Sequence, residues 1–285
     1  MSLLGSLPVV RELRAVARLV AGPLGGDFEE DEWGYAPGFV DAAGPLLDFL
    51  YDRWWRITAT GAEHVPAGGR ALLVANHAGV LPWDAAMTAT ALRRAGGSAA
   101  RDPRFLVLDW AFGLPWASVA IRRAGGVPAS PHNALRLLQQ EHLVMVFPEG
   151  ARGVGKPFSE RYRLRRFGRG GFVELALRTG APIIPVAIVG SEEIYPKLAD
   201  LPGVARLLDA PYVPITPTFP LLGPLGAIPL PSRWRIAFGP AVDLRGLGPE
   251  AADDRGTMLE LAEEVRGRVQ SMVYEQLIAR PGAFR

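Results

Sequence analysis

Five short apolar runs, separated by segments with helical periodicity, constrain the fold of this 285-residue chain more than any other feature. The runs that have the composition of β-strands cover residues 71–76, 104–110, 143–147, 182–189 and 234–239. The helical patterns fall near residues 82–95, 111–122, 132–141, 169–180 and 191–199. Strands that are apolar along their whole length are covered on both faces, as in a sheet between two layers of helices. We therefore predict an α/β fold with a mixed, mostly parallel central sheet and helices on both faces.

Helical segments also precede and follow this region. Residues 7–21 have apolar side chains on one face and arginines on another, so we expect an amphipathic helix that lies in a membrane interface or packs on the domain. Further helices are expected from about residue 38 to 55 and from about 249 to 279. The predicted division is an N-terminal helical, membrane-associating extension (1–55), a central domain (56–245) and a C-terminal helix that packs on it (246–285).

Composition excludes several classes of function. The chain contains no cysteine, which removes disulfides, thiolate catalysis and cysteine-ligated metal sites and fits a reducing compartment. The formal net charge is only +2, so a general nucleic-acid binder is not expected. Because His64, His132 and His142 lack metal-ligand spacing, we predict no metal site.

A charge-free segment of 23 residues, 210–232, is long enough to cross a membrane if it is helical. It contains seven prolines, however, and each of them removes a backbone donor from a helix. Because the hydrocarbon core does not tolerate unsatisfied backbone groups, this segment is not expected to span. Two interpretations remain: an apolar loop that contacts a bilayer or lines a lipid groove, and an internal loop buried under the C-terminal helix.

One histidine stands at the end of an apolar run, with an aspartate seven residues later. In the stretch ALLVANHAGVLPWDAAM (71–87), His77 follows the first predicted strand, where α/β folds place their chemistry. Pro82 suits a first helical position, which puts Asp84 in the opening turn of the next helix, where the helix dipole stabilises a carboxylate. If the two side chains meet, His77 is a general base that Asp84 orients. The alternative is that Asp84 caps its helix and His77 is a structural loop residue.

A third apolar run ends in a Pro-Glu-Gly turn that is followed by an arginine. The sequence LVMVFPEGARG (143–153) places Glu149, Gly150 and Arg152 after the strand, and two such strand ends can form one pocket above the sheet. Further on, the sequence PIIPVAIVG covers residues 182–190. An NH…D box, an FPEG-x-R box and a PI-x-PV stretch in this order resemble the glycerolipid acyltransferase superfamily, the PlsC-like lysophospholipid acyltransferases, over roughly residues 56–240.

This resemblance implies an O-acyltransferase that moves a fatty acyl group from acyl-CoA or acyl-carrier protein to a glycerolipid-type hydroxyl, that of a lysophospholipid or a mono- or diacylglycerol. His77 would be the general base and Asp84 its orienting acid, whereas Glu149, Gly150 and Arg152 would form a substrate-positioning turn. No cofactor is implied apart from the acyl donor as co-substrate. The implied location is the cytoplasmic face of a membrane, where a peripheral protein meets its lipid acceptor.

Seven basic residues follow the Pro-Glu-Gly turn within eighteen positions, from Arg152 to Arg169. Such a run can hold the phosphates of coenzyme A, an acyl-carrier helix or anionic lipid, and Arg169 is a predicted substrate contact. The alternative is a basic loop that is solvated and has no binding role.

The sequence departs from the family pattern at two places. Six residues separate His77 from Asp84, where the family box usually has four, so the intervening loop must bulge for the side chains to meet. Residues 124–134 also lack the basic residue that holds the acceptor phosphate in many members, which leaves room for a neutral acceptor. Two rival functions stay open: a thioesterase that uses the same pair on water, and a non-catalytic lipid-binding protein.

Overall fold

The computed structural model describes residues 26–77, 81–97, 100–113, 117–150, 153, 155–207, 213–244 and 246–284. The predicted helix at 7–21 and the predicted substrate contact Arg152 lie outside these residues. None of the helices in the described residues combines the length and the apolar character that a membrane span requires.

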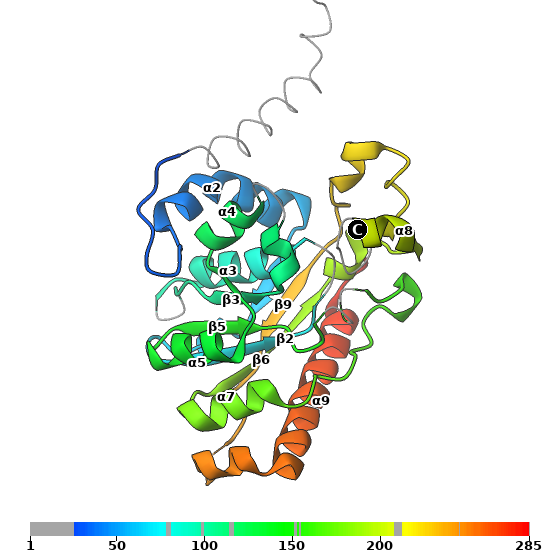
Figure 1. Cartoon of the computed structure of the whole chain (residues 1–285). Helices are drawn as coiled ribbons and strands as arrows, with labels where there is room; N and C mark the ends of the chain where they lie inside the picture. The colour runs from blue at the N-terminus through cyan, green and yellow to red at the C-terminus, as the bar shows by residue number, and fades with distance from the viewer. Residues whose placement is uncertain are drawn as a thin grey trace, which may run out of the picture.

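A seven-stranded sheet forms the centre of the fold (Figure 1). Its strands, in spatial order, are β1 (Thr58–Thr60), β9 (Arg235–Phe238), β6 (Ile183–Val189), β2 (Ala71–Ala75), β5 (Leu143–Val146), β3 (Arg104–Val107) and β4 (Gly126–Pro128). Strands β6, β2, β5, β3 and β4 run parallel to one another, whereas β9 pairs antiparallel with β6 and carries β1 parallel to itself. The prediction of a mixed, mostly parallel sheet is confirmed.

Two layers of helices cover this sheet, because its apolar strands present side chains to both faces. The helices of the described residues are α2 (Pro37–Phe49), α3 (Trp83–Ala95), α4 (Ala117–Arg123), α5 (Pro131–Gln139), α7 (Gly171–Thr179), α8 (Pro202–Leu207) and α9 (Arg255–Ala279). Helix α3 and the π-helical turn that continues α2 pack on the face to which Leu73 of β2 points. Helices α5, α7 and α9 pack on the other face, against Leu72 and Val74. This alternation is the two-residue period of a strand that is buried on both sides.

The parallel strands give the sheet two functionally different ends. The carboxyl ends of β2, β5, β3 and β6 lie together, and we call this the carboxyl end of the sheet. His77 comes two residues after β2, and the Pro-Glu-Gly turn follows β5, so both predicted motifs lie at this end. At the opposite end, called the amino end, residues 180–182 lead from α7 into β6.

Some predicted elements differ from the structure. The predicted strand at 104–110 ends at Val107, and a 3-10 turn, Asp109–Gly113, follows it. The predicted helix at 191–199 is only the 3-10 turn Ser191–Glu193, because Pro196 has no N–H to donate and disfavours helical geometry at the residue before it. The chain then leaves the main sheet and forms α8 and a small antiparallel pair, β7 (Ala199–Asp200) with β8 (Pro214–Ile215), none of which the sequence pattern indicates.

Candidate active site

Asn76 fixes the backbone from which His77 projects. Its side chain is buried just after β2, where Nδ2 donates to the carbonyl oxygen of Ile188 (2.8 Å) and Oδ1 accepts from the Ile188 N–H (2.8 Å). These bonds satisfy the amide and tie the end of β2 to β6. Sequence reasoning missed Asn76, although a polar residue at the end of a buried strand is itself a signal, because it requires partners.

His77 and Asp84 are in direct contact. The distance between His77 Nδ1 and Asp84 Oδ2 is 2.6 Å, and Asp84 lies fully buried in the first turn of α3. Because a carboxylate only accepts hydrogen bonds, Nδ1 donates its proton to Asp84 and Nε2 remains as the basic nitrogen. The side chain of His77 keeps 17% of its surface exposed. The six-residue spacing therefore does not prevent the contact, and the pair has the geometry of a general base and its orienting acid.

Opposing effects act on the pKa of His77. Burial lowers this pKa, because the charged imidazolium loses its hydration, and the positive charge of Lys156 also lowers it. Asp84 raises it through its charge and its hydrogen bond, and Glu149 raises it through its charge. The result is a pKa for His77 above its ordinary value of 6.5. Asp84 thus strengthens the imidazole as a base.

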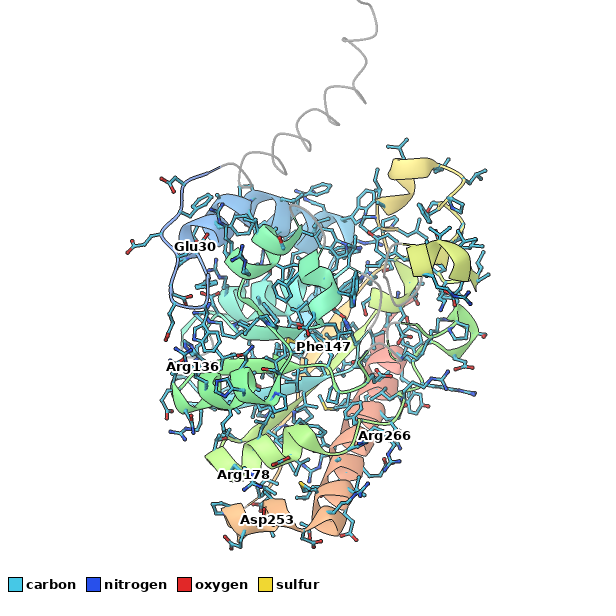
Figure 2. All side chains as sticks on the ribbon, viewed as in Figure 1. Glu30, Arg136, Phe147, Arg178, Asp253 and Arg266 are labelled. Atoms are coloured by element: carbon cyan, nitrogen blue, oxygen red, sulfur yellow. The ribbon has the colours of Figure 1, made fainter. Side chains whose placement is uncertain are left out.

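The ring of Phe147, the residue after β5, stacks on the ring of His77. Their centroids are 4.3 Å apart and their planes are inclined by 28°. Phe147, labelled in Figure 2, is partly buried against the core cluster that covers one face of the sheet. Stacking on one side and the bond to Asp84 on another restrict the imidazole to one orientation, which preorganises it for proton transfer.

The carboxylate of Glu149, a predicted substrate contact, is engaged within the protein. It is buried, its Oε1 accepts from the backbone N–H of His77 (3.2 Å), and its Oε2 accepts from the backbone N–H of Arg165 (2.7 Å). The two neighbours of Glu149 line the cavity described below, whereas its own oxygens are engaged within the protein. Glu149 therefore holds the backbone that carries His77 and fixes the chain beyond the Pro-Glu-Gly turn.

Lys156 is the buried partner of Glu149. Its Nζ lies 3.1 Å from Glu149 Oε2 and 3.0 Å from Glu192 Oε1, and its side chain is almost wholly buried. Burial lowers the pKa of Lys156, but the two carboxylates outweigh this effect and raise the pKa above its ordinary value. Lys156 is thus a cation that links the turn after β5 to the turn after β6. Sequence reasoning placed it in a basic run, and nothing in the local spacing distinguishes it from its exposed neighbours.

A cavity of about 290 Å³ opens beside His77. Most of its wall is apolar, and it includes Phe105, Leu106, Val107, Leu108, Trp110 and Ile121 from β3 and the segments near it. Two predicted substrate contacts, Gly150 and Arg169, line the same cavity. Gly150 adopts a left-handed conformation (φ +55°), which glycine tolerates best. An apolar wall with a few polar groups at one side is the usual form of a small-molecule binding site.

The basic run does not form a single cluster in the structure. Lys156 is buried, whereas Arg161, Arg163, Arg166 and Arg169 are exposed. Arg165, also exposed, pairs with Glu160. Among the described members of the run, Arg169 is the one that lines the cavity beside His77.

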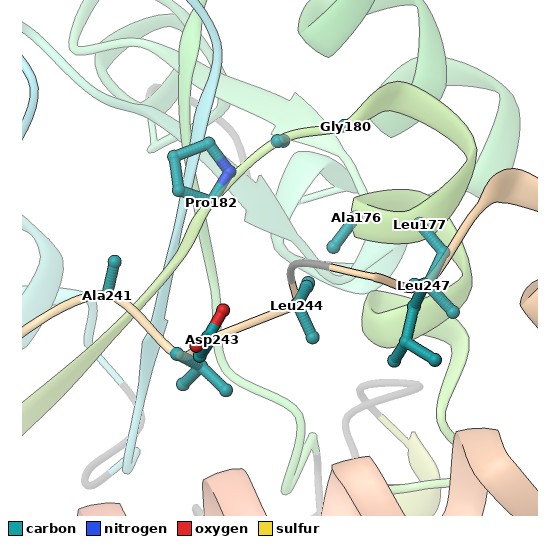
Figure 3. Close-up of a pocket in the computed structure, with 10 residues that line it drawn as sticks. Ala176, Leu177, Gly180, Pro182, Ala241, Asp243, Leu244 and Leu247 are labelled. Carbon is teal, nitrogen blue, oxygen red and sulfur yellow. The ribbon is translucent and has the colours of Figure 1, made fainter.

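A larger cavity, of about 400 Å³, lies at the amino end of the sheet (Figure 3). Residues from the end of α7, the start of β6 and the segment after β9 line it, including Leu177, Pro182, Ala241, Asp243 and Leu247. Asp243 is the one ionisable group among its described lining residues. In the described part of the chain, no group of three or more His, Cys, Asp or Glu side chains has the geometry to hold a metal ion. The candidate base, His77, lines the smaller cavity.

Comparisons with known proteins show which sequences this chain resembles. A family model described as acyltransferase matches residues 56–189. An uncharacterized protein of Mycobacterium tuberculosis (strain ATCC 25618 / H37Rv) is 48% identical over 271 residues, which are 95% of this chain and 75% of that protein. Phytyl ester synthase 1, chloroplastic, of Arabidopsis thaliana is 27% identical over 172 residues, which are 54% of this chain and 24% of that protein.

A solved structure shares the fold. The crystal structure of the 1-acyl-sn-glycerophosphate (LPA) acyltransferase PlsC from Thermotoga maritima matches with a TM-score of 0.52 and 16% sequence identity, over 91% of this chain and 89% of that chain. At this identity the likeness concerns the fold alone. The family model, in contrast, covers β2 and β5 and the residues that follow them, His77 and Glu149 included. Residues 56–189 of this chain thus match the acyltransferase family, and the chain has the PlsC-like fold.

Proposed function

We propose that this protein transfers a fatty acyl group from a thioester, acyl-CoA or acyl-carrier protein, to a hydroxyl group of a glycerolipid-type acceptor. The observation that carries the proposal is the contact of 2.6 Å between His77 Nδ1 and Asp84 Oδ2 in the wall of an apolar cavity. A base at the mouth of a lipid-chain site is what direct acyl transfer to an alcohol requires.

The proposed reaction needs one base and no covalent intermediate with the protein. His77 Nε2 accepts the proton of the acceptor hydroxyl while the hydroxyl oxygen attacks the carbonyl carbon of the thioester. Asp84 stabilises the imidazolium that forms. The tetrahedral intermediate then collapses, the carbon–sulfur bond breaks, and the imidazolium returns its proton to the leaving thiolate. The products are an ester and a free thiol.

Other residues of the cavity position the substrates in this proposal. The apolar wall around Phe105 and Trp110 holds the acyl chain. Arg169, which is exposed and lines the cavity, binds a phosphate of the donor or of a headgroup. Arg152 keeps the role that the family resemblance implies, as a contact for a phosphate or a polarised carbonyl. Glu149 acts through the backbone of His77.

The acceptor is proposed to be neutral, a mono- or diacylglycerol rather than a lysophosphatidic acid. Residues 124–134, which form β4 and the start of α5, contain no lysine or arginine. Arg123, which immediately precedes them, donates to Glu30 (2.7 Å). The name of the related phytyl ester synthase, whose product is an ester of a long-chain alcohol, also favours a neutral hydroxyl. We further propose that the protein works as a peripheral protein on the cytoplasmic face of a membrane, where both lipid substrates reside.

The proposal is tested by measuring free thiol and ester product with palmitoyl-CoA and a panel of acceptors. The panel comprises monoacylglycerol, diacylglycerol, a long-chain alcohol, lysophosphatidic acid and no acceptor. The wild type is compared with His77→Ala and with His132→Ala, a control in an exposed histidine of α5. Thiol release is expected to depend on a neutral acceptor and to fall by about 10²–10⁴-fold in His77→Ala only.

The rival functions give different results in the same assay. A thioesterase releases thiol and free fatty acid without an acceptor and forms no ester. A non-catalytic lipid-binding protein releases no thiol in either version. A loss of less than about tenfold in His77→Ala would remove the general base from the mechanism.

A further inference from the structure

Exposed apolar side chains gather at one place on the surface. Of the thirteen large hydrophobic residues that the described part of the chain exposes, six lie between residues 198 and 228. Leu221 is 82% exposed and Leu225 is 58% exposed, and Leu222 and Ile228 are about half exposed. They belong to the charge-free loop 213–231, whose 3-10 turn Gly223–Ala227 stands beyond α8 in Figure 1 (yellow). The exposed leucines exclude the interpretation of this part as a loop buried under the C-terminal helix.

An aromatic side chain extends this apolar surface onto the neighbouring helix. The indole Nε1 of Trp54, in the π-helical turn after α2, donates to the carbonyl oxygen of Pro229 (3.0 Å). The ring of Phe49, which is 43% exposed, lies 6.2 Å from the ring of Trp54. We call the surface formed by Phe49, Leu221, Leu222, Leu225 and Ile228 the apolar patch. A patch of this kind on a monomer marks an interaction site.

The apolar patch is attached to the candidate active site. The loop belongs to the segment that leaves the sheet at the carboxyl end of β6 and returns to it at the start of β9, and this is also the end where His77 lies. The hydroxyl of Tyr195 accepts from Trp83 Nε1 (3.3 Å) and donates to the carbonyl oxygen of Ala227 (2.6 Å). Trp83 directly precedes Asp84 in the first turn of α3. Two hydrogen bonds thus connect the loop to the residue before the catalytic carboxylate.

Several backbone N–H groups of the loop are bonded within the loop. Thr216 N–H donates to Phe219 O (2.8 Å), and Thr216 Oγ1 accepts from the N–H of Phe219 (2.9 Å). At the tip, the N–H of Leu222 bonds to Thr218 O (2.8 Å), and the N–H groups of Gly223, Leu225 and Ile228 also bond to loop carbonyls. The prolines of the loop have no N–H to satisfy. A loop with few free donors can enter the apolar part of a bilayer interface at low cost, and a protein partner would not require this property.

The charged residues around the apolar patch favour binding to an anionic surface. Arg53, next to Trp54, and Arg206, in α8 beside the loop, are exposed. The nearby acids are paired, because Asp52 bonds to Arg94 (2.9 Å) and Asp200 to Lys197 (2.9 Å). An apolar tip with arginines beside it is the arrangement that binds bilayers containing anionic lipid.

We infer that the apolar patch is the surface through which this protein docks on a lipid bilayer that contains anionic lipid, so that the cavity beside His77 opens next to the membrane. The inference deepens the proposed function, because it names the surface by which lipid substrates reach the site. Its principal test measures binding and needs no catalysis.

Vesicle flotation of the full chain provides this test. The variant Leu221→Ser/Leu225→Ser is compared with the wild type on vesicles of phosphatidylcholine and phosphatidylglycerol. Because both side chains are exposed in the free protein, the variant keeps the thermal stability of the wild type, while its vesicle affinity falls by about tenfold or more. Leu247→Ser, an exposed leucine at the amino end of the sheet, is the matched control and binds as the wild type does.

Measurements of acyl transfer distinguish a failure of this inference from a failure of the proposed function. His77→Ala is expected to bind vesicles normally and to lack acyl transfer. The loop variant should transfer a short acyl chain to a water-soluble alcohol at the wild-type rate, and lose activity only on acceptors embedded in vesicles. If the loop variant binds vesicles as tightly as the wild type, the inference is overturned, whatever His77→Ala shows. A shift of the wild type from dimer to monomer in the loop variant, with unchanged vesicle binding, would instead assign the patch to a second copy of the chain.

Discussion

The two ends of the central sheet each carry a cavity, but only one of them has the chemistry of an active site. The amino end holds the larger space, about 400 Å³, among aliphatic side chains and a single described acid, Asp243. The carboxyl end holds about 290 Å³, with His77 in its wall. We therefore place the proposed reaction at the smaller cavity, because a base with a raised pKa beside a carboxylate is a stronger sign of a functional site than cavity size.

The same contrast holds for the ionic groups at the two ends. At the carboxyl end, Lys156 and Glu149 form a pair that is shielded from water. At the amino end, Arg178 of α7 pairs with Asp253 (2.9 Å) on the surface, as Figure 2 shows at the bottom of the view. Buried pairs are costly to break and surface pairs are not, so disturbing the two ends should have very different consequences.

The largest expected effect is that of Asp84→Asn. The amide keeps the shape of the carboxylate but can neither hold the tautomer nor stabilise the imidazolium, so kcat/KM should fall by about 10²–10⁴-fold. An isosteric change at the amino end, Asp243→Asn, serves as the control and should leave kcat/KM unchanged. If both variants are equally active, the comparison between the two ends fails.

The pH profile of kcat/KM refines this first prediction. His77 must be neutral to accept a proton, so the wild-type rate falls with decreasing pH through a pKa above 6.5. In Asp84→Asn the effects of burial remain and the attraction of Asp84 is lost, so the acid limb moves to lower pH. The contribution of His77 to the free energy of unfolding has the opposite pH dependence to the rate. Protonated His77 stabilises the folded state fully below pH about 6.5, and this stabilisation is lost as the pH rises through the folded-state pKa.

The next effect concerns stability. Lys156→Met leaves two buried carboxylates, Glu149 and Glu192, facing each other without a cation, which should cost about 3–5 kcal/mol in the free energy of unfolding at pH 7. Urea denaturation measures this loss. The deficit should shrink when Glu192→Gln is added, and also at low pH, where the carboxylates become protonated. Arg178→Met, the control at the amino end, should leave the urea midpoint almost unchanged.

A smaller effect is expected from filling each cavity in turn. Ala129 lines the cavity beside His77 and Ala241 lines the cavity at the amino end, and both residues are exposed. Ala129→Phe should lower kcat/KM for a long-chain donor by about tenfold, because it takes space from the acyl chain, and should affect a short-chain donor less. Ala241→Phe should change neither value. A loss of long-chain activity in Ala241→Phe would move the acyl site to the other end of the sheet.

The sequence predicted the sheet and one contact well because both depend on local patterns. Fully apolar runs indicate strands buried on both faces, and a histidine at a strand end beside a helix that starts directly after Pro82 brings His77 close to Asp84. What the sequence missed depends on distant partners. Lys156 resembles its exposed neighbours until the turn after β6 brings Glu192 against it, and Asn76 gains its meaning only from Ile188. For the same reason the sequence did not predict that Glu149 bonds to the backbone of His77.

The smallest expected effect is that of Ser130→Ala. This variant tests whether a residue influences the reaction merely because it lies at the carboxyl end of the sheet. Ser130 caps α5 there, and its Oγ accepts from the N–H of Asn133 (3.1 Å). Ser130→Ala should cost about 1 kcal/mol of stability, because an N–H in the first turn of the helix loses its capping partner. It should leave kcat/KM unchanged, since the proposed site consists of groups around His77 and needs no anion at this helix. Thermal unfolding and steady-state kinetics on the same preparation measure both quantities. A fall in kcat/KM for a phosphate-bearing acceptor alone would show that the start of α5 holds that phosphate, and the proposal of a neutral acceptor would then be wrong.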